Sequence, residues 1–193
     1  KPIRSTYLIN KANFVACHNP AYVNKYNMVQ DIVDGGTFLL NCSWDMAGIE
    51  ENLPGQAKRY IAEHNINFYT IDGIKIGKEI GLGGRINTVL QSAFFKLSGV
   101  LEEAKAIELM KAAAKATYGK KGDAIVQMNY DAIDQGAQKI VKIDVPESWK
   151  NCEDEFLGKK ADGENKDIIN FVNNIQIPVN AQEGNKLPVS AFK

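Results

Sequence analysis

Residues 37–42, Thr-Phe-Leu-Leu-Asn-Cys, form an apolar run of strand-forming residues near the start of the chain. An unbroken run of this length is typical of a strand that is covered on both faces. A second such run occupies residues 66–72, and two helical patterns, at 45–52 and 54–65, separate the two runs. Because parallel neighbouring strands need a long crossover between them, this order predicts a βαβ unit.

The remaining elements extend the alternation of strands and helices. We expect short strands at residues 7–9 and 14–17. We expect helices from Pro20 toward residue 33 and at residues 73–80. Three amphipathic helices follow, with apolar residues spaced three and four apart, at residues 86–99, 101–118 and 123–141. We therefore expect an α/β fold, a three-layer α/β/α sandwich with a mostly parallel or mixed sheet.

The character of the sequence changes after residue 145. Residues 146–193 are rich in charged residues, proline and glycine, with one short apolar pattern at 166–175. This composition is typical of an extended linker, here with one small helix. We therefore expect an α/β domain at residues 1–145 and a linker at 146–193. The first residue is Lys1 rather than methionine, so we interpret the chain as an excised segment or a processed chain.

Charge and cysteine content argue against several classes of function. Lys plus Arg and Asp plus Glu both number 23, so no overall field would attract nucleic acid or an anionic membrane. No apolar stretch approaches the roughly 20 residues of a membrane-spanning helix. The cysteines, Cys17, Cys42 and Cys152, form no CxxC pair, which argues against a bound iron–sulfur cluster or zinc ion. We interpret them as reduced thiols of a cytoplasmic protein.

No pattern predicts a nucleophile or a set of metal ligands. The two histidines, His18 and His64, lie in no metal-binding motif, and His64 is expected to satisfy carbonyl groups at a helix end. Cys17 and His18 are adjacent at the end of a predicted strand, where neighbouring side chains point to opposite faces. A catalytic Cys–His pair is therefore not expected, and we assign no catalytic residue.

The most informative polar segment is IGLGGRIN, residues 80–87, between two predicted helices. Gly83 and Gly84 would let the backbone approach a ligand, and the start of the next helix presents N–H groups that suit a phosphate. Arg85 adds a cation, and Asn87 adds an amide that donates and accepts. The alternative is a connector with a glycine helix cap. The residues alone do not separate these two interpretations.

Two further candidates lie downstream of this segment. Asn129 lies one position beyond Met128, a member of an apolar helix stripe, and an exposed asparagine on a helix usually has no function. Lys120 and Lys121 lie in a turn bracketed by glycines, where they would either meet a phosphate or be simply solvated.

Several sequence blocks together carry a resemblance to a known family. They read KPIRSTYLI at 1–9, VACHNPAY at 15–22, EIGLGGRINTVLQSAFFKLSGVL at 79–101 and YGKKGDAIVQMNYDAIDQG at 118–136. In this order they resemble the central γ-type domain (domain III) of pyruvate:ferredoxin (flavodoxin) oxidoreductases, over at least residues 1–145. The end of the chain, through LPVSAF at 187–192, resembles the linker of these enzymes toward their ferredoxin-like domain.

The resemblance implies the activity of a larger enzyme. Such an enzyme oxidatively decarboxylates pyruvate, transfers the acyl group to coenzyme A and passes the electrons to ferredoxin or flavodoxin. Thiamine diphosphate and [4Fe-4S] clusters would be bound by other domains of the same polypeptide, in a homodimer that serves anaerobic metabolism. The isolated segment is expected to be inactive.

The resemblance also implies roles for particular residues. Asn87 of the GGRIN block and Asn129 of the QMNYDA block match two coenzyme A contacts of the family. Other coenzyme A contacts of the family, in a glycine-rich loop and on a lysine, belong upstream of Lys1. Two other functions remain as alternatives: a segment that mainly packs against its neighbours, and a free-standing nucleotide- or flavin-binding protein.

Overall fold

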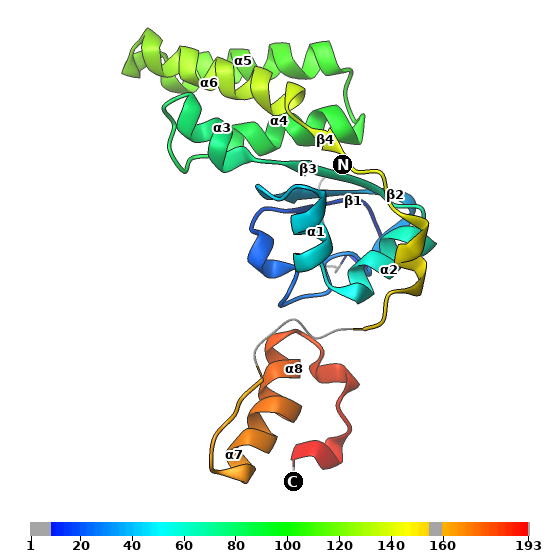
Figure 1. Cartoon of the computed structure of the whole chain (residues 1–193). Coiled ribbons are helices and arrows are strands. Elements are labelled where there is room, and N and C mark those ends of the chain that lie inside the picture. The colour runs from blue at the N-terminus through cyan, green and yellow to red at the C-terminus, as the bar shows by residue number, and fades with distance from the viewer. Residues whose placement is uncertain (1–8, 155–159, 193) are drawn as a thin grey trace, which may run out of the picture.

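A computed structural model describes residues 9–154 and 160–192 of the chain. The centre of this part is a four-stranded sheet whose strands lie side by side in chain order (Figure 1). β1 (Ala12–Cys17), β2 (Ile32–Asn41) and β3 (Asn67–Ile71) run parallel. The two-residue β4 (Val141–Lys142) pairs antiparallel with β3. The sheet is therefore mixed.

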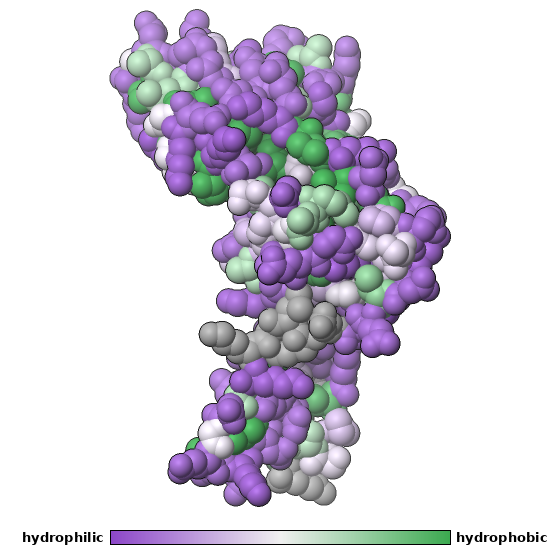
Figure 2. All heavy atoms as spheres, in the orientation of Figure 1, coloured by the Kyte–Doolittle hydropathy of each residue, from purple (hydrophilic) through white to green (hydrophobic). Residues whose placement is uncertain are grey.

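Helices cover both faces of the sheet (Figure 1). α1 (Met46–Asn52) and α2 (Gly55–Glu63) connect β2 to β3 and lie on one face. The helices on the other side are α3 (Gly73–Glu79), α4 (Asn87–Ser98), α5 (Glu103–Tyr118) and α6 (Asp123–Gln138). Figure 2 shows hydrophobic atoms gathered where this helical layer meets the sheet, below a mostly hydrophilic outer surface. The predicted α/β class is confirmed.

β2 shows why the sheet is covered on both faces. Phe38 and Leu40 are fully buried in the cluster that contains α1 and α2, whereas Leu39 is buried in the cluster of α3 and α4. Successive side chains of a strand point to opposite faces, so the unbroken apolar run needs an apolar partner on each side. Full burial of each such side chain contributes roughly 1.5–3 kcal/mol.

α6 lies in close contact with α4. A Cβ atom at Gly136 of α6 would lie 2.4 Å from the carbonyl oxygen of Val89 in α4, so only glycine fits there. One turn before Gly136 in α6, the carbonyl oxygen of Ile133 accepts a 2.6 Å hydrogen bond from Ser92 Oγ of α4. This approach brings the middle of α6 alongside the start of α4, where the candidate asparagines lie.

The helix predicted from Pro20 toward residue 33 is wrong. Only Pro20–Tyr22 forms a 3-10 turn, in which the side chain of Asn19 accepts from a backbone N–H. Val29 is buried in the core, and Ile32 pairs with Ala12 as the first residue of β2. Strand pairing with β1 and burial of these side chains override the local helical signal.

The other predicted strands and helices up to α6 are confirmed, with ends that differ by a few residues. The strand predicted at residues 7–9 lies mostly outside the described residues, and Ile9 lies in no strand. β4 was not predicted, because two exposed residues carry no strand signal of their own.

The chain after residue 145 first packs against the body of the protein. Glu147–Asn151 forms a 3-10 turn, and its Trp149 is 1% exposed in the same cluster as α2. Farther along, α7 (Lys166–Phe171) continues through a π-helical turn, Val172–Gln176, into α8 (Ile177–Asn180), so the small helix is longer than predicted. The division into a domain at 1–145 and a linker at 146–193 stays a prediction.

Candidate functional site

The glycine-rich loop between α3 and α4 closes the end of α3. The carbonyl oxygen of Gly77 accepts hydrogen bonds from the backbone N–H groups of Leu82, at 2.8 Å, and Gly83, at 3.0 Å. Gly81 and Gly83 have φ angles of 82° and 62°, a conformation that favours glycine. The loop therefore has the geometry of a connector, and the N–H of Gly83 is already used.

Other groups of this loop are open to solvent. Gly84, Arg85 and Asn87 are exposed. Arg85 donates its Nε–H to the carbonyl oxygen of Leu82, at 3.2 Å, which uses one of its five donors. Asn87 is the first residue of α4, and no described side chain caps that helix, so the N–H groups of its first turn remain available to a ligand.

Asn129 is buried, which contradicts the expectation that it is exposed. It lies on α6 at 4% exposure, because α6 packs against α4 on one side and α5 on the other. Its Nδ2 donates to the carbonyl oxygen of Ile125 at 2.8 Å, and its Oδ1 accepts from Thr88 Oγ1 at a long 3.5 Å. Thr88 directly follows Asn87, so the structure brings the segments of both candidate asparagines together.

A groove of about 340 Å³ opens beside Asn129, between α4, α5 and α6. Thr88, Gln91 and Asn129 provide polar groups to its wall, and Asn87 is not among the lining residues. The apolar wall comes largely from α5 and the residues before it, and includes Leu101, Ala106, Leu109, Met110 and Ala114. The apolar stripe of α5 is predictable from the sequence but the groove is not, because a periodic stripe does not reveal which part of it stays uncovered.

The chemistry available in this groove is recognition rather than bond cleavage. Asn129 and Thr88 can donate and accept hydrogen bonds, and neither is a nucleophile activated by a base. Ligand pockets commonly combine a mostly apolar wall with a few polar groups of this kind.

Lys120 and Lys121, the two lysines considered as phosphate contacts, are both exposed. The Nζ of Lys121 lies 5.6 Å from the ring centroid of Tyr118.

The cysteine and histidine side chains form no reactive pair. Cys17 is 1% exposed and donates to the carbonyl oxygen of Asn19 at 3.1 Å, whereas His18 is exposed. Burial raises the pKa of the Cys17 thiol to about 11, so it stays protonated and unreactive at neutral pH. His64 ends α2, where its Nδ1 lies 2.6 Å from Asp34.

Residues 9–154 and 160–192 contain neither a metal-binding cluster nor a membrane-spanning helix. In this part of the chain no group of three or more His, Cys, Asp or Glu side chains is arranged to hold a metal ion. Among the described helices, none has the length and apolarity needed to cross a membrane.

Residues 1–139 match the family described as Pyruvate ferredoxin/flavodoxin oxidoreductase. The chain is 47% identical over 191 residues to a pyruvate-flavodoxin oxidoreductase of Enterobacter agglomerans, a match that covers 99% of this chain and 16% of that protein. It is 42% identical over 192 residues to a pyruvate:ferredoxin oxidoreductase of Moorella thermoacetica, covering 100% of this chain and 16% of that protein.

A solved structure with a similar fold is the pyruvate oxidoreductase subunit PORC from Thermotoga maritima. The TM-score is 0.56 at 13% identity, over 70% of this chain and 67% of that one. At this identity the likeness concerns the fold alone. The chain spans only 16% of the length of the two curated relatives. By its sequence match over residues 1–139, the chain belongs to the pyruvate ferredoxin/flavodoxin oxidoreductase family.

Proposed function

We propose that this chain is a segment of a pyruvate:ferredoxin (flavodoxin) oxidoreductase and that it contributes to coenzyme A binding and to domain assembly. The complete enzyme would convert pyruvate, coenzyme A and oxidised ferredoxin to acetyl-coenzyme A, carbon dioxide and reduced ferredoxin. Family membership supports this, since relatives with these names match nearly the whole chain. In this proposal other domains of the same polypeptide hold the thiamine diphosphate and the [4Fe-4S] clusters.

The observation that carries the coenzyme A role is the position of Asn129 and Thr88, in contact with each other, on the wall of the α4–α5–α6 groove. The pantetheine arm of coenzyme A has two amide groups separated by short aliphatic stretches. A mostly apolar groove that also presents the amides of Asn129 and Gln91 and the hydroxyl of Thr88 suits that alternation of polar and apolar groups. Asn129 Oδ1, whose bond to Thr88 is long, would accept a hydrogen bond from an amide of the arm.

Asn87 has a different role in this proposal. It lies at the exposed start of α4, one residue before Thr88. Its amide and the N–H groups of the first turn suit a phosphate group of coenzyme A, and Gly84 and Arg85 precede it in the same exposed loop. Gly83 contributes through the shape of the loop rather than its N–H, which is bonded to Gly77.

The same family membership supports the partners that we propose for the complete enzyme. Electrons would leave on ferredoxin or flavodoxin, the two carriers that appear in the names of the relatives. We propose that the enzyme is a cytoplasmic homodimer and that this segment alone does not turn over pyruvate. Formation of acetyl-coenzyme A by the purified 193-residue chain would contradict that assignment.

An NMR titration of the ¹⁵N-labelled 193-residue chain with coenzyme A tests the site. We expect saturable shifts of the Asn129 side-chain amide and of the backbone amides of Asn87 and Thr88. Pantetheine alone should shift the groove residues, and adenosine 3′,5′-bisphosphate alone should shift the start of α4. If coenzyme A shifts no NMR resonance of Asn87 or Asn129, this segment has no coenzyme A role.

One observation favours a second function, a packing surface for neighbouring domains. Val100 is 62% exposed, Leu101 40% and Leu109 47%, and the last two also line the groove. Exposed apolar side chains gathered in one place often mark an interface. If the segment acts only through packing, coenzyme A and its fragments should leave the NMR spectrum unchanged.

A further inference from the structure

The carboxyl end of the sheet forms a second concave region, which neither Asn87, Thr88 nor Asn129 lines. β2 and β3 are neighbouring parallel strands. The helices that follow them leave to opposite faces, because α1 belongs to the cluster of Phe38 and α3 to the cluster of Leu39. In parallel α/β sheets such a divergence opens a crevice at the carboxyl ends of the two strands, where ligands usually bind.

A buried asparagine fixes the floor of this crevice. Asn41 ends β2 at 4% exposure, and its Nδ2 donates to the carbonyl oxygen of His18 at 2.9 Å. Its Oδ1 accepts the backbone N–H of Gly73, also at 2.9 Å. One side chain at the end of β2 thus links the segments that follow β1 and β3. Because Asn41 is buried and each end of its amide already bonds to the backbone, we assign it the role of positioning the crevice.

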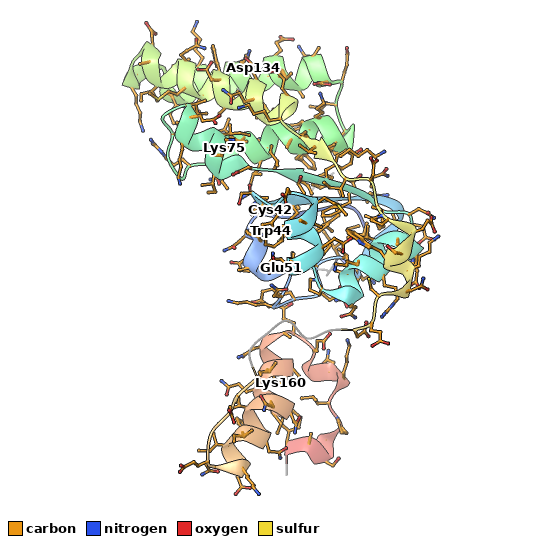
Figure 3. All side chains as sticks on the ribbon, viewed as in Figure 1. Cys42, Trp44, Glu51, Lys75, Asp134 and Lys160 are labelled. Carbon is orange, nitrogen blue, oxygen red and sulfur yellow. The ribbon has the colours of Figure 1, made fainter. Side chains whose placement is uncertain are left out.

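Two adjoining cavities occupy the crevice. One, of about 510 Å³, extends toward Pro20 and Lys78, and the other, of about 290 Å³, extends toward Trp44. The residues common to both cavities are Cys42, Ser43, Asp72 and Lys75. Figure 3 shows Cys42 and Trp44 near the end of β2, with Lys75 across from them on the α3 side. The combined space is large enough for a ligand of nucleotide size.

The charged side chains of the crevice leave two ammonium groups available. Glu79 is paired with Lys139 at 2.9 Å, and the carboxylate of Asp72 caps α3 by accepting the backbone N–H of Lys75. Within residues 9–154 and 160–192, neither Lys75 nor Lys78 forms an ion pair. Both lysines are exposed and line the larger cavity.

The uncharged part of the crevice supplies a hydroxyl and an apolar wall. Ser43 is exposed where the two cavities meet. Ile74, 40% exposed, and Pro20 line the larger cavity beside the lysines. A pair of cations, a hydroxyl and an adjacent apolar surface together suit an anion that carries an uncharged body.

We propose that this crevice is a second ligand site, which binds a small molecule through a phosphoryl group. The ammonium groups of Lys75 and Lys78 and the hydroxyl of Ser43 bind the phosphate oxygens. The site is separate from the candidate coenzyme A contacts, because α3 stands between them. On α3, Gly73 and Gly77 face Ile86 at the start of α4, whereas Lys75 and Lys78 line the crevice.

Sodium pyrophosphate and adenosine diphosphate are the two probes, each titrated into the ¹⁵N-labelled 193-residue chain. We expect saturable shifts of the backbone amides of Ser43, Gly73 and Lys75 with both probes. Adenosine diphosphate that binds about threefold tighter or more would identify a nucleotide as the ligand. Equal affinity for the two probes would show that the pyrophosphate group alone accounts for binding.

A pair of double variants makes the test specific to the crevice. Lys75→Gln with Lys78→Gln should raise the Kd for pyrophosphate about tenfold or more. Lys105→Gln with Lys115→Gln removes the same charge from exposed positions on α5 and should change the Kd by less than about twofold. Equal losses in the two double variants, or no saturable shift at Ser43 and Gly73, would overturn the proposal.

Discussion

The indole N–H of Trp149 donates a 2.6 Å hydrogen bond to the carboxylate of Glu50, which lies 99 positions earlier in the chain. The ring is 1% exposed, and its centroid lies 6.3 Å from that of Phe68 in β3. Glu50 also forms an ion pair with Lys58 of α2 at 3.2 Å. The segment that follows residue 145 is thus anchored to both α1 and α2.

Removal of this anchor should cost much of the stability of the fold. Trp149→Ala is expected to lower the free energy of unfolding by about 3–5 kcal/mol in urea titrations, because it empties a large buried volume. Trp149→Phe keeps an aromatic ring but loses the N–H, so a smaller loss of about 1–3 kcal/mol is expected. Trp44→Phe, at a half-buried position, is the control. A Trp149→Ala chain as stable as the control would show that the segment is not anchored.

Two glycines test the contact between α4 and α6. In Gly136→Ala the new methyl group would meet the carbonyl oxygen of Val89 at 2.4 Å, so α6 must move. We expect a loss of about 2 kcal/mol or more, although alanine is favoured over glycine within a helix by about 1 kcal/mol. Gly119 has φ of −54° and nothing within 4 Å of the added atom. Gly119→Ala should therefore be neutral or slightly stabilising, and equal unfolding midpoints for the two variants would contradict the packing described.

The raised pKa of Cys17 predicts a loss of stability in alkaline solution. Burial raises this pKa from an ordinary value of 9.0 to about 11, so the unfolded chain releases its proton first. The stabilisation is present below pH 9 and is lost as the pH rises toward 11, by roughly 2 kcal/mol for this group. Cys17→Ala should therefore lose less stability between pH 9 and 11 than the unsubstituted chain, in urea titrations at each pH.

Cys152 provides the control for that pH series, because it is a half-buried cysteine whereas Cys17 is fully buried. Cys152→Ala should keep the full alkaline loss. Burial also raises the pKa of Cys42, so Cys17→Ala retains part of the loss. Identical pH profiles for Cys17→Ala and Cys152→Ala would show that ionisation of Cys17 does not contribute.

Local sequence patterns predict the strands and helices whose apolar faces pack against ordinary helical layers or sheets. The run at 37–42 is apolar on both of its faces, so its burial between two helical layers followed from the sequence alone. The stripes of α4, α5 and α6 predicted helices because each has a continuous apolar face. The region after Pro20 was mistaken for a helix, since the pairing of Ile32 with Ala12 depends on a segment that is distant in the chain.

The candidate site was harder to predict from the sequence, because its geometry depends on packing between distant segments. The sequence showed Asn129 beside an apolar stripe, but not that α6 packs on two sides and buries its amide next to Thr88. The anchor of Trp149 was missed because a charged, proline-containing segment is usually solvated. The crevice around Asn41 depends on the opposite directions in which α1 and α3 leave the sheet, which no local pattern specifies.

The affinity of matched asparagine variants for coenzyme A shows whether Asn87 and Asn129 contact this ligand. Isothermal titration calorimetry would compare the unsubstituted chain with Asn87→Ala, Asn129→Ala and the exposed control Asn180→Ala on α8. Loss of one hydrogen bond to the ligand should raise the Kd about fivefold or more for Asn87→Ala and Asn129→Ala. Asn180→Ala should bind like the unsubstituted chain. Coenzyme A affinities that do not differ among the three variants would contradict a coenzyme A site on this segment.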